Sequence, residues 1–462
     1  MRPFVIKPHL RLKGEISFLG DKSIAHRAII VSALTRGKTT IENFPANKDC
    51  LRTLRAFQKL GIRTKVGLAR TVTVFGKGLH GLSASHAPIS AGESGTTLRL
   101  LLGVLAGQDF KTKLVASPSL SHRPMLRVTE PLRLMGAKIY GQTGKCRLRT
   151  APRQRRRRAN GQREEYPPIV IQGGNLRPIK YRMPLASAQV KSAILLAGLY
   201  AKGTTKIIEP LKSRDHTERM LKLFKADIKL SRNNIVIKGG RELTSPKRIY
   251  IPGDISSASF FMIATAILPD SLLIIKNVNL NPSRIGIINV LRRMETNIKI
   301  RYLSPNTYRL TPNVKNYEPA GDIIVKSSKL KGAIIKREEI PFLIDEIPIL
   351  MVAACFACGR TIFEGAGELR VKETDRIRSM SENLKKMGAN ISLSKVNAVE
   401  RIIIKGVKHL EGTKVRSFGD HRTAMSMVAA GLAAEGKTTI DDISCINKSF
   451  PGFISALKKL IA

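Results

Sequence analysis

The sequence predicts an α/β fold of two globular halves, each assembled from repeated α/β units. Three observations lead to this prediction. Two kinds of helix-to-strand joint recur along the whole chain. A short strand followed by Pro and Gly, at Tyr250–Asp254, marks a boundary between the halves, and a new apolar helix is expected at Ser256–Leu268. Repeats dictate architecture, and copies this long and rich in strands argue against a thin solenoid.

The first joint is an apolar helical segment that ends in a small turn before a short β-like run. It occurs as KLGIRTKV (59–66), LMGAKIYG (134–141), LFKADIKL (223–230), RMETNIKI (293–300) and KMGANISLS (386–394). The second joint places a Gly or turn residue between a helix end and a β-rich run. It occurs as TRGKTTIENF (35–44), YAKGTTKIIEP (200–210), ILPDSLLIIKNV (267–278), ACGRTIFEGA (357–366) and AEGKTTIDDI (434–443).

Length and composition are those of a soluble globular protein. A chain of 462 residues is too long for one core and indicates about two to four domains. The N-terminal segment lacks the apolar stretch of a secretory signal. The longest apolar runs, 258–268 and 347–358, are shorter than the roughly 18 residues that a membrane span needs. We therefore expect a cytoplasmic protein with no membrane partner.

The charge balance is strongly basic, since 80 basic and 34 acidic residues give a net charge of +46. Such an excess indicates anionic substrates or polyanions, so a nucleic-acid-binding protein is one alternative. Against it stand an aromatic content of 5%, the absence of Trp and the lack of an RNA- or DNA-binding motif. The basic insertion 145–166 is expected to be a mobile surface loop that binds nucleic acid only non-specifically.

The five cysteines are scattered and odd in number, so they predict no disulfide framework. Cys355 and Cys358 form a lone CxxC inside an apolar run. Zinc or redox chemistry is one interpretation, and two small buried side chains on a helix is the favoured one. We expect no metal and no cofactor.

The most informative stretch is Gly365–Arg376, GAGELRVKETDR. If a helix begins near Val371, Lys372 and Arg376 lie at i,i+4 on one face with Glu373 beside them. Two cations and a carboxylate on one face can hold an anion and move a proton next to it. Taken alone, the same pattern also fits a solvated helix face with ion pairs.

Other segments pair a helix start or turn with a cation. Free backbone N–H groups beside a cation form a site for a phosphate or carboxylate. A capped helix with a surface cation would look the same, but the number of such segments favours anion binding. They are DKSIAHR (Asp21 or Ser23 as cap, Lys22, Arg27), GESGTTLR (Ser94, Gly95, Thr96, Arg99), SHRPM (Arg123), LASAQVKSA (Ser187, Gln189, Lys191), SRDHTER (Ser213, Arg214, His216), GDHRTA (His421, Arg422) and NKSFPG (Lys448).

Acidic residues are the minority and therefore informative. Asp345 and Glu346 lie between apolar neighbours, just ahead of an apolar helix. Asp345 is expected to cap that helix. A carboxylate beside a cationic site can also act as a base towards a substrate hydroxyl, with Glu373 donating a proton on the other side.

These segments, in this order, resemble the enolpyruvyl transferases over nearly the whole chain. The likeness rests on DKSIAHRA, GTTLR, RPM, SAQVKSAILLA, SRDHTERM, PGDISSAS, IDEIP, LRVKETDRI, GDHR and NKSFPGF. The resemblance implies two similar domains, each of three βαβαββ units forming an inside-out α/β barrel, with the active site in the interdomain cleft. One domain would span residues 21–251, with the insertion 145–166, and the other 1–20 plus 252–462.

By the same resemblance, the reaction transfers the enolpyruvyl group of phosphoenolpyruvate to the 5-hydroxyl of shikimate-3-phosphate and releases phosphate, on the route to chorismate and the aromatic amino acids. Lys22, Asp345 and Glu373 would be catalytic. Phosphoenolpyruvate would be bound by Lys22, Gly95, Arg123, Gln189, Arg376, Arg422 and Lys448. Shikimate-3-phosphate would be bound by Lys22, Ser23, Arg27, Ser187, Ala188, Gln189, Ser213, Asp345 and Lys372.

Three residues depart from a common form of the family pattern: Ala188 replaces a second serine, and Glu368 and Glu93 stand where asparagine is frequent. The nearest rival is the sister enzyme, UDP-N-acetylglucosamine enolpyruvyl transferase, which carries a cysteine in the loop before the RP segment. The loop SPSLSHRPM has no cysteine, which favours shikimate-3-phosphate as the acceptor. The expected partners are the two small substrates, and the protein is expected to be a monomer.

Overall fold

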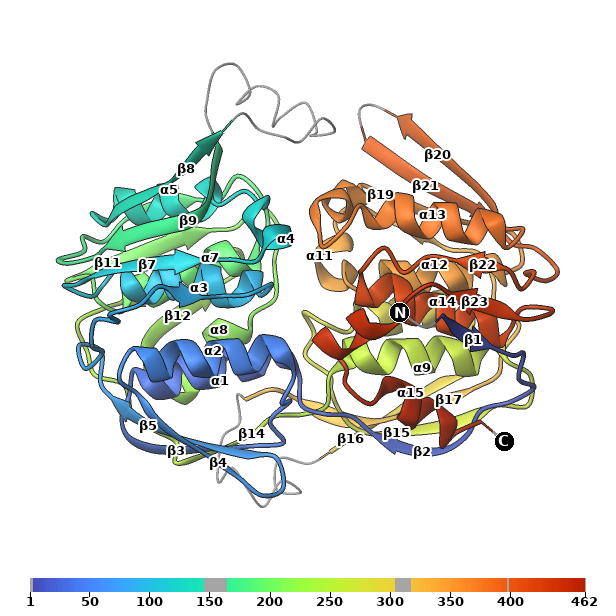
Figure 1. Cartoon of the computed structure of the whole chain (residues 1–462), viewed down its shortest axis with the longest axis horizontal. Helices are drawn as coiled ribbons and strands as arrows, with labels where there is room; N and C mark the ends of the chain where they lie inside the picture. The colour runs from blue at the N-terminus through green and yellow to red at the C-terminus, as the bar shows by residue number, and fades with distance from the viewer. Residues whose placement is uncertain (1–2, 145–163, 304–316, 397–398, 462) are drawn as a thin grey trace.

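The computed structural model describes residues 3–144, 164–303, 317–396 and 399–461, and shows an α/β protein of two lobes joined at one end (Figure 1). Each lobe has its own hydrophobic core. The first lobe's core is built from residues between Ile24 and Ile251. The second lobe's core combines Ile6–Phe18 with Ile255–Leu460. The domain limits predicted at 20/21 and 251/252 fall between these two cores.

Three sheets surround the helices of the first lobe. Their strand orders are β14-β3-β5-β4, β6-β7-β9-β8 and β10-β11-β13-β12. The strands are β3 (Arg36–Glu42), β4 (Arg63–Gly67), β5 (Thr71–Lys77), β6 (Ile89–Ser90), β7 (Lys111–Val115), β8 (Lys138–Gly144), β9 (Glu164–Gln172), β10 (Lys180–Arg182), β11 (Thr204–Ile208), β12 (Asp227–Ser231), β13 (Asn234–Lys238) and β14 (Arg248–Tyr250). The helices are α1 (Lys22–Ala33), α2 (Lys48–Lys59), α3 (Gly95–Leu105), α4 (Pro118–Ser121), α5 (Leu126–Leu134), α7 (Ala188–Gly198) and α8 (His216–Leu223).

The second lobe repeats this arrangement with sheets β16-β17-β15-β2, β18-β19-β21-β20 and β1-β23-β22. The strands are β1 (Phe4–Ile6), β2 (Lys13–Ser17), β15 (Leu272–Asn279), β16 (Ile298–Tyr302), β17 (Ala320–Lys326), β18 (Ile334–Ile335), β19 (Arg360–Glu364), β20 (Asn390–Val396), β21 (Val399–Lys405), β22 (Lys414–Val415) and β23 (Thr438–Ile440). The helices are α9 (Ile255–Ile267), α10 (Gly286–Arg293), α11 (Ile340–Leu343), α12 (Ile347–Cys355), the 3₁₀ helix η2 (Ala366–Val371), α13 (Arg376–Lys386), α14 (His421–Leu432), the 3₁₀ helix η3 (Ser444–Lys448) and α15 (Phe453–Lys458).

In the part of the chain that the structure describes, five of the six sheets share one topology, which confirms the prediction of a repeated unit. In each of them one strand pairs parallel with its neighbour and the remaining pairs are antiparallel, as in β6-β7-β9-β8. Both kinds of predicted joint occur where expected. All five joints of the first kind turn through a residue with positive φ, where glycine is favoured but not obligatory. These residues are Gly61, Gly136, Lys225, Glu295 and Gly388.

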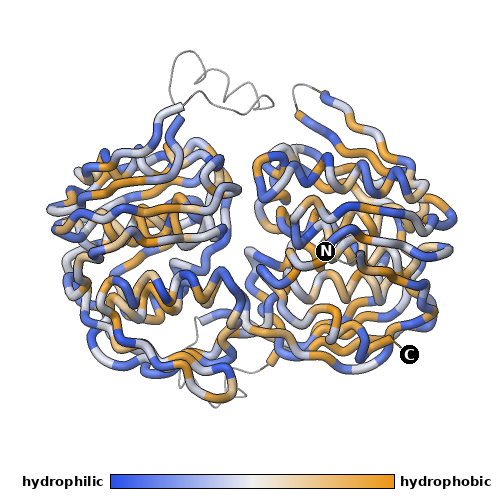
Figure 2. The backbone as a smooth tube through the Cα atoms, viewed as in Figure 1, coloured by the Kyte–Doolittle hydropathy of each residue, from blue (hydrophilic) through white to orange (hydrophobic). Residues whose placement is uncertain are grey.

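The helices inside the sheets are apolar on every side. All nine residues of α12 are buried, and α9 is nearly as enclosed. A helix that is hydrophobic all round must lie in the interior, and Figure 2 shows hydrophobic segments running through both lobes. Among the described residues, no helix is long and apolar enough to cross a membrane.

The chain crosses between the lobes twice, and the two crossovers are hydrogen bonded to each other. The N–H of Asp21 donates to Pro252 O at 2.9 Å, and the N–H of Asp254 donates to Leu19 O at 3.0 Å. Gly20 allows this close contact, because a Cβ there would lie 2.7 Å from Ile251 Cγ2 on the second crossover. The new helix after the crossover begins at Ile255, one residue before its predicted start.

Two sequence predictions outside the site need correction. The insertion was predicted to extend to 166, but residues 164–166 belong to strand β9, while 145–163 lie outside the described residues. Cys355 is buried in α12 as expected, whereas Cys358 lies beyond the helix end and is exposed. The helix ends at Cys355, so Cys358 is not carried on its buried face.

Candidate active site

A cleft of about 1500 Å³ lies between the lobes, lined by residues of both. It brings together, from distant parts of the sequence, nearly every residue proposed above for the site. Lining it are Lys22, Ser23, Arg27, Gly95, Arg123, Ser187, Ala188, Gln189, Ser213, Asp345, Lys372, Glu373, Arg376 and Arg422. Lys448 is the exception: it does not line the cleft, and its Nζ lies 3.0 Å from Glu93 Oε2, which does.

The first-lobe wall is made of helix N-termini. α1, α3 and α7 begin at the cleft, and their N-caps are Asp21, Ser94 and Ser187. Each cap accepts a hydrogen bond from its own helix, and the Asp21 carboxylate accepts from Ser23 N and Ile24 N. The structure thus resolves the predicted choice of Asp21 or Ser23 as cap in favour of Asp21. Helix N-termini favour anions, because their N–H groups are free and the helix dipole is positive there.

The second-lobe wall carries charged side chains, and here one prediction is wrong. No helix begins near Val371; residues Ala366–Val371 form η2, and α13 begins at Arg376, capped by Asp375. Lys372 and Arg376 are therefore not neighbours on one helical face. Lys372 lies in the link between the two helices and Arg376 is the first residue of α13, yet both line the cleft.

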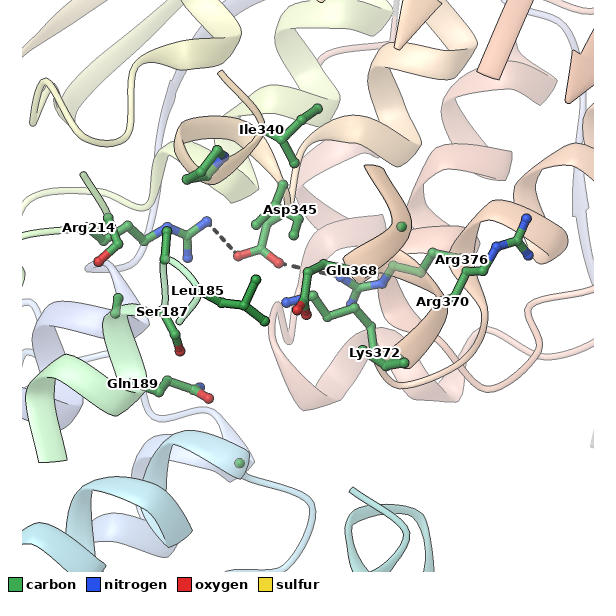
Figure 3. A pocket seen from close by; sticks show the side chains of 18 of the residues that line it. Leu185, Ser187, Gln189, Arg214, Ile340, Asp345, Glu368, Arg370, Lys372 and Arg376 are labelled. Carbon is green, nitrogen blue, oxygen red and sulfur yellow. Dashed lines mark hydrogen bonds and ion pairs between the residues drawn. The ribbon is translucent and has the colours of Figure 1, made fainter. Parts of the chain in front are cut away.

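Asp345 lies among cations from both lobes. Its carboxylate is 2.7 Å from Arg214 of the first lobe, 3.4 Å from Arg376 and 3.5 Å from Arg422 Nε. Figure 3 shows Asp345 between Arg214 and the second-lobe arginines, with Ser187 and Gln189 on the facing wall. Burial alone would raise the pKa of Asp345, but Arg422, Arg214, Lys372 and Arg376 lower it well below its ordinary value.

Asp345 does not cap the following helix, contrary to the prediction. The N-cap position of α12 is Glu346, and it makes no side-chain capping bond. Asp345 lies one residue earlier in the turn, and its side chain is taken by arginines of both lobes.

Glu373 is the second carboxylate of the cleft and is also held by cations from both lobes. Arg376 Nη2 lies 2.5 Å from it and Arg123 Nη2 of the first lobe 3.2 Å. Burial would raise its pKa, but Arg376, Arg123, His421 and Lys22 lower it well below the ordinary value. Arg376 itself is buried and also contacts Asp420 at 2.8 Å, so one guanidinium connects three carboxylates.

Further contacts were not foreseen from the sequence. Lys22 Nζ lies 3.2 Å from Asp49 in the first turn of α2. Arg99 donates to Gln189 Oε1 at 2.5 Å, and this hydrogen bond fixes the side-chain amide of Gln189, a residue proposed to bind substrate. The sequence indicates Arg214 only as a cation near a turn, whereas the structure shows that its contact with Asp345 links the two lobes. No spacing in the sequence reveals such pairs, because 27 or more residues separate their members.

Among the described residues, no group of three or more His, Cys, Asp or Glu side chains is arranged to hold a metal ion. The cleft is instead rich in basic side chains, with thirteen Lys or Arg residues and eight Asp or Glu residues lining it. Such a site favours ligands with several negative charges.

Known proteins resemble this chain along its whole length. The sequence model of the EPSP synthase (3-phosphoshikimate 1-carboxyvinyltransferase) family matches residues 6–160 and 157–457. Two relatives named 3-phosphoshikimate 1-carboxyvinyltransferase, from Desulforamulus reducens and Thermodesulfovibrio yellowstonii, are 43% and 45% identical over 457 residues, covering 99% of both chains in each case. The solved structure of EPSP synthase from Acinetobacter baumannii superposes with a TM-score of 0.83 at 38% identity, covering 100% of this chain and 98% of that chain. The chain belongs to the EPSP synthase family, a family of transferases with the two-domain α/β fold seen here.

Proposed function

We propose that this chain transfers the enolpyruvyl group of phosphoenolpyruvate to the 5-hydroxyl of shikimate-3-phosphate in the cleft between its lobes. The observation that carries the proposal is the pair Asp345 and Glu373, each held by arginines of both lobes in a cationic cleft. This is the reaction for which the family is named. It has the acceptor predicted from the sequence, and the UDP-sugar reaction is not favoured.

Shikimate-3-phosphate is proposed to bind mainly to the first lobe. Ser23, at the start of α1, and Ser187, at the start of α7, offer hydroxyls beside helix N-termini. Arg27 is buried, and its Nη1 donates to Ser23 O at 2.8 Å, so its position is fixed before the phosphate arrives. The complete set is Lys22, Ser23, Arg27, Ser187, Ala188, Gln189, Ser213, Asp345 and Lys372. Ala188 offers only its backbone N–H to that phosphate.

Phosphoenolpyruvate is proposed to bind at the start of α3, where both lobes supply cations. Gly95 is the first residue of α3, and a Cβ there would lie 3.2 Å from Arg99 Nη1 and 3.5 Å from Arg123 Nη1. The absence of a Cβ therefore leaves room for an anion to approach the helix N-terminus beside these two guanidinium groups. The proposed set is Lys22, Gly95, Arg123, Gln189, Arg376, Arg422 and Lys448, the last swinging in from the edge of the cleft.

Bound substrates would change the basicity of both carboxylates. In the free protein, arginines hold Asp345 and Glu373 ionised and weakly basic. The substrates bring two phosphates and two carboxylates, which take up the same cations and raise both pKa values. Each carboxylate becomes able to exchange a proton when both substrates are present.

The proton transfers then have assigned groups. Glu373 protonates the methylene carbon of phosphoenolpyruvate and leaves a cationic centre at C2. The 5-hydroxyl oxygen bonds to C2 and gives its proton to Asp345. The new methyl group then returns a proton to Glu373, the bond from C2 to the phosphate oxygen breaks with its electron pair leaving on phosphate, and the enol double bond forms again. Lys22 and the arginines stabilise the negative charge of the leaving phosphate, and exclusion of water by closure protects the cationic centre.

The test is phosphate release from phosphoenolpyruvate with and without shikimate-3-phosphate. We expect release only with both substrates, and none with a UDP-amino sugar as acceptor. Asp345→Ala and Glu373→Gln should each lower turnover by about 10²–10⁴-fold, the usual range for a general acid or base. The exposed Asp109→Ala and Glu338→Gln are matched controls that should retain wild-type turnover. Wild-type turnover in Asp345→Ala or Glu373→Gln would remove the assigned proton transfers.

The remaining properties are proposed from the sequence. We propose a monomer located in the cytoplasm. Light scattering during gel filtration would test the oligomeric state, since a monomer elutes with the mass of one chain. RNA affinity measured against salt, with and without residues 145–163, would test whether any nucleic-acid binding is confined to the insertion.

A further inference from the structure

The most unusual buried charge outside the proposed ligand sites is Arg284, which lies where the two crossovers meet. It is 2% exposed, and three carboxylates surround its guanidinium. Nη1 lies 2.9 Å from Asp21, while Nη2 lies 3.6 Å from Asp254 and 3.7 Å from Glu346. Nη2 also donates to Ser256 Oγ at 2.6 Å.

The three carboxylates belong to the starts of three different helices. Asp21 caps α1, whose first residue is Lys22, and it is the first residue after the crossover into the first lobe. Asp254 caps α9, directly after the crossover back into the second lobe. Glu346 precedes α12 and directly follows Asp345. A single guanidinium therefore connects the first-lobe helix that carries Lys22 with the second-lobe turn that carries Asp345.

This cluster is not arranged for stability alone. One cation faces three buried carboxylates, and the cluster lines the floor of the cleft through Asp254, Ser256 and Arg284. Within the described residues, Arg284 Nε and Glu346 Oε2 are buried without a hydrogen-bond partner. Unbalanced buried charge is costly, and it is most often kept where a protein uses it.

The charge imbalance of the cluster affects the pKa of Asp254. Burial raises its pKa, and so does the negative charge of Asp21; Arg284, Arg422 and a hydrogen bond from Ser256 N lower it. The resulting pKa is about 6, so this carboxyl exchanges its proton close to neutral pH. Glu346 is linked to Asp254 through the shared Arg284 and through Ser256, whose hydroxyl donates to Glu346 and whose N–H donates to Asp254.

We propose that Arg284 is a positioning residue that sets Lys22 of the first lobe against Asp345 of the second when the lobes close on the substrates. The proposal rests on the function proposed above. In a closure that rotates the lobes about the crossovers, a planar guanidinium with five donors can keep contact with both sides. A lysine in place of Arg284 would keep the positive charge but could contact only some of the three carboxylates.

The experiment compares Arg284→Lys, Arg284→Met and Asp254→Asn with the wild type and with Arg292→Lys, an exposed arginine of α10, as the control. Turnover and KM come from phosphate release across pH 5–8. Calorimetric titration measures shikimate-3-phosphate affinity without turnover. We expect kcat to fall about 10²-fold in Arg284→Lys and further in Arg284→Met, because misplacement by about 1 Å costs that much. Affinity for shikimate-3-phosphate should stay within a few-fold, since most of its proposed ligands belong to the first lobe.

In the wild type we expect kcat to change near pH 6, where Asp254 exchanges its proton. Asp254→Asn keeps the helix cap and removes one carboxylate, and it should abolish this change. If the arginine variants do not fold, this variant alone decides the question. Wild-type kcat in Arg284→Lys, or an unaltered pH profile in Asp254→Asn, would overturn the proposal, as would equal losses of kcat and substrate affinity. Absence of phosphate release by the wild type would instead refute the proposed function.

Discussion

The two walls of the cleft use their charges differently. In the first lobe, Lys191 is fully enclosed behind the wall, with Glu218 at 2.7 Å and Glu209 at 3.0 Å. The wall itself presents helix N-termini, hydroxyls and cations such as Arg27 and Arg123. In the second lobe, Asp345 and Glu373 face the cleft, and their cationic partners are the ones proposed to hold substrate. Under the proposed function, the first lobe would hold most ligands of the acceptor, whereas the second would supply both carboxylates that exchange protons.

Loss of Arg376 should have the largest effect, because this residue contacts both carboxylates of the second-lobe wall. Arg376→Gln leaves Asp345, Glu373 and Asp420 without their common partner. We expect turnover to fall at least about 10²-fold, since one charge-stabilising donor is worth that much. Removing one partner of a buried charge pair should also lower the unfolding free energy by about 3–5 kcal/mol. Phosphate release and denaturant unfolding measure the two effects. Arg378→Gln, on the exposed side of α13, is the control.

Lys191 should give the opposite result, a large loss of stability with little loss of turnover. Lys191→Met leaves Glu209 and Glu218 buried without their cation, which should cost about 3–5 kcal/mol. Turnover of the folded protein should change little, although KM for shikimate-3-phosphate should rise because Ser213 donates to Glu209. The double variant Lys191→Met with Glu218→Gln should recover part of the stability. A fall in kcat as large as that of Arg376→Gln would contradict the division between the walls.

The buried charges at the crossovers should make the free energy of unfolding depend on pH. The pKa of Asp254 rises from 3.8 to about 6 on folding, so the folded protein binds this proton more tightly than the unfolded chain. Its stabilising effect is complete below about pH 4 and is lost as the pH rises through about 6. Between pH 4.5 and 7.5 the free energy of unfolding of the wild type should fall by about 2 kcal/mol more than that of Asp254→Asn. Denaturant unfolding of both proteins at the two pH values gives this difference, and parallel curves would refute it.

Features with local signals could be predicted from the sequence, whereas contacts between distant residues could not. The joints of both kinds were found because a turn residue and a switch from helical to alternating periodicity are local signals, which held even where Lys225 or Glu295 replaces glycine. The first-lobe caps were found for the same reason. Asp345 was misassigned as a cap because two adjacent acids look alike in a sequence, and only packing shows that Glu346 is buried beside Arg284. Asp49 and Arg214 contact residues on other elements that are distant in the sequence, which no spacing reveals.

The smallest expected effect concerns the edge of the cleft, where Glu93 of the first lobe holds Lys448 of the second. Both side chains are partly exposed, so the pair is worth about 1 kcal/mol at most. Glu93→Gln keeps the size of the side chain and frees the ammonium group for phosphoenolpyruvate. KM for phosphoenolpyruvate should therefore fall by up to about 5-fold at low salt, and the gain should shrink at high salt. The exposed Glu435→Gln is the control. A higher KM in Glu93→Gln would show that Glu93 orients Lys448 towards the substrate, and a carboxylate of the first lobe would then take part in binding phosphoenolpyruvate.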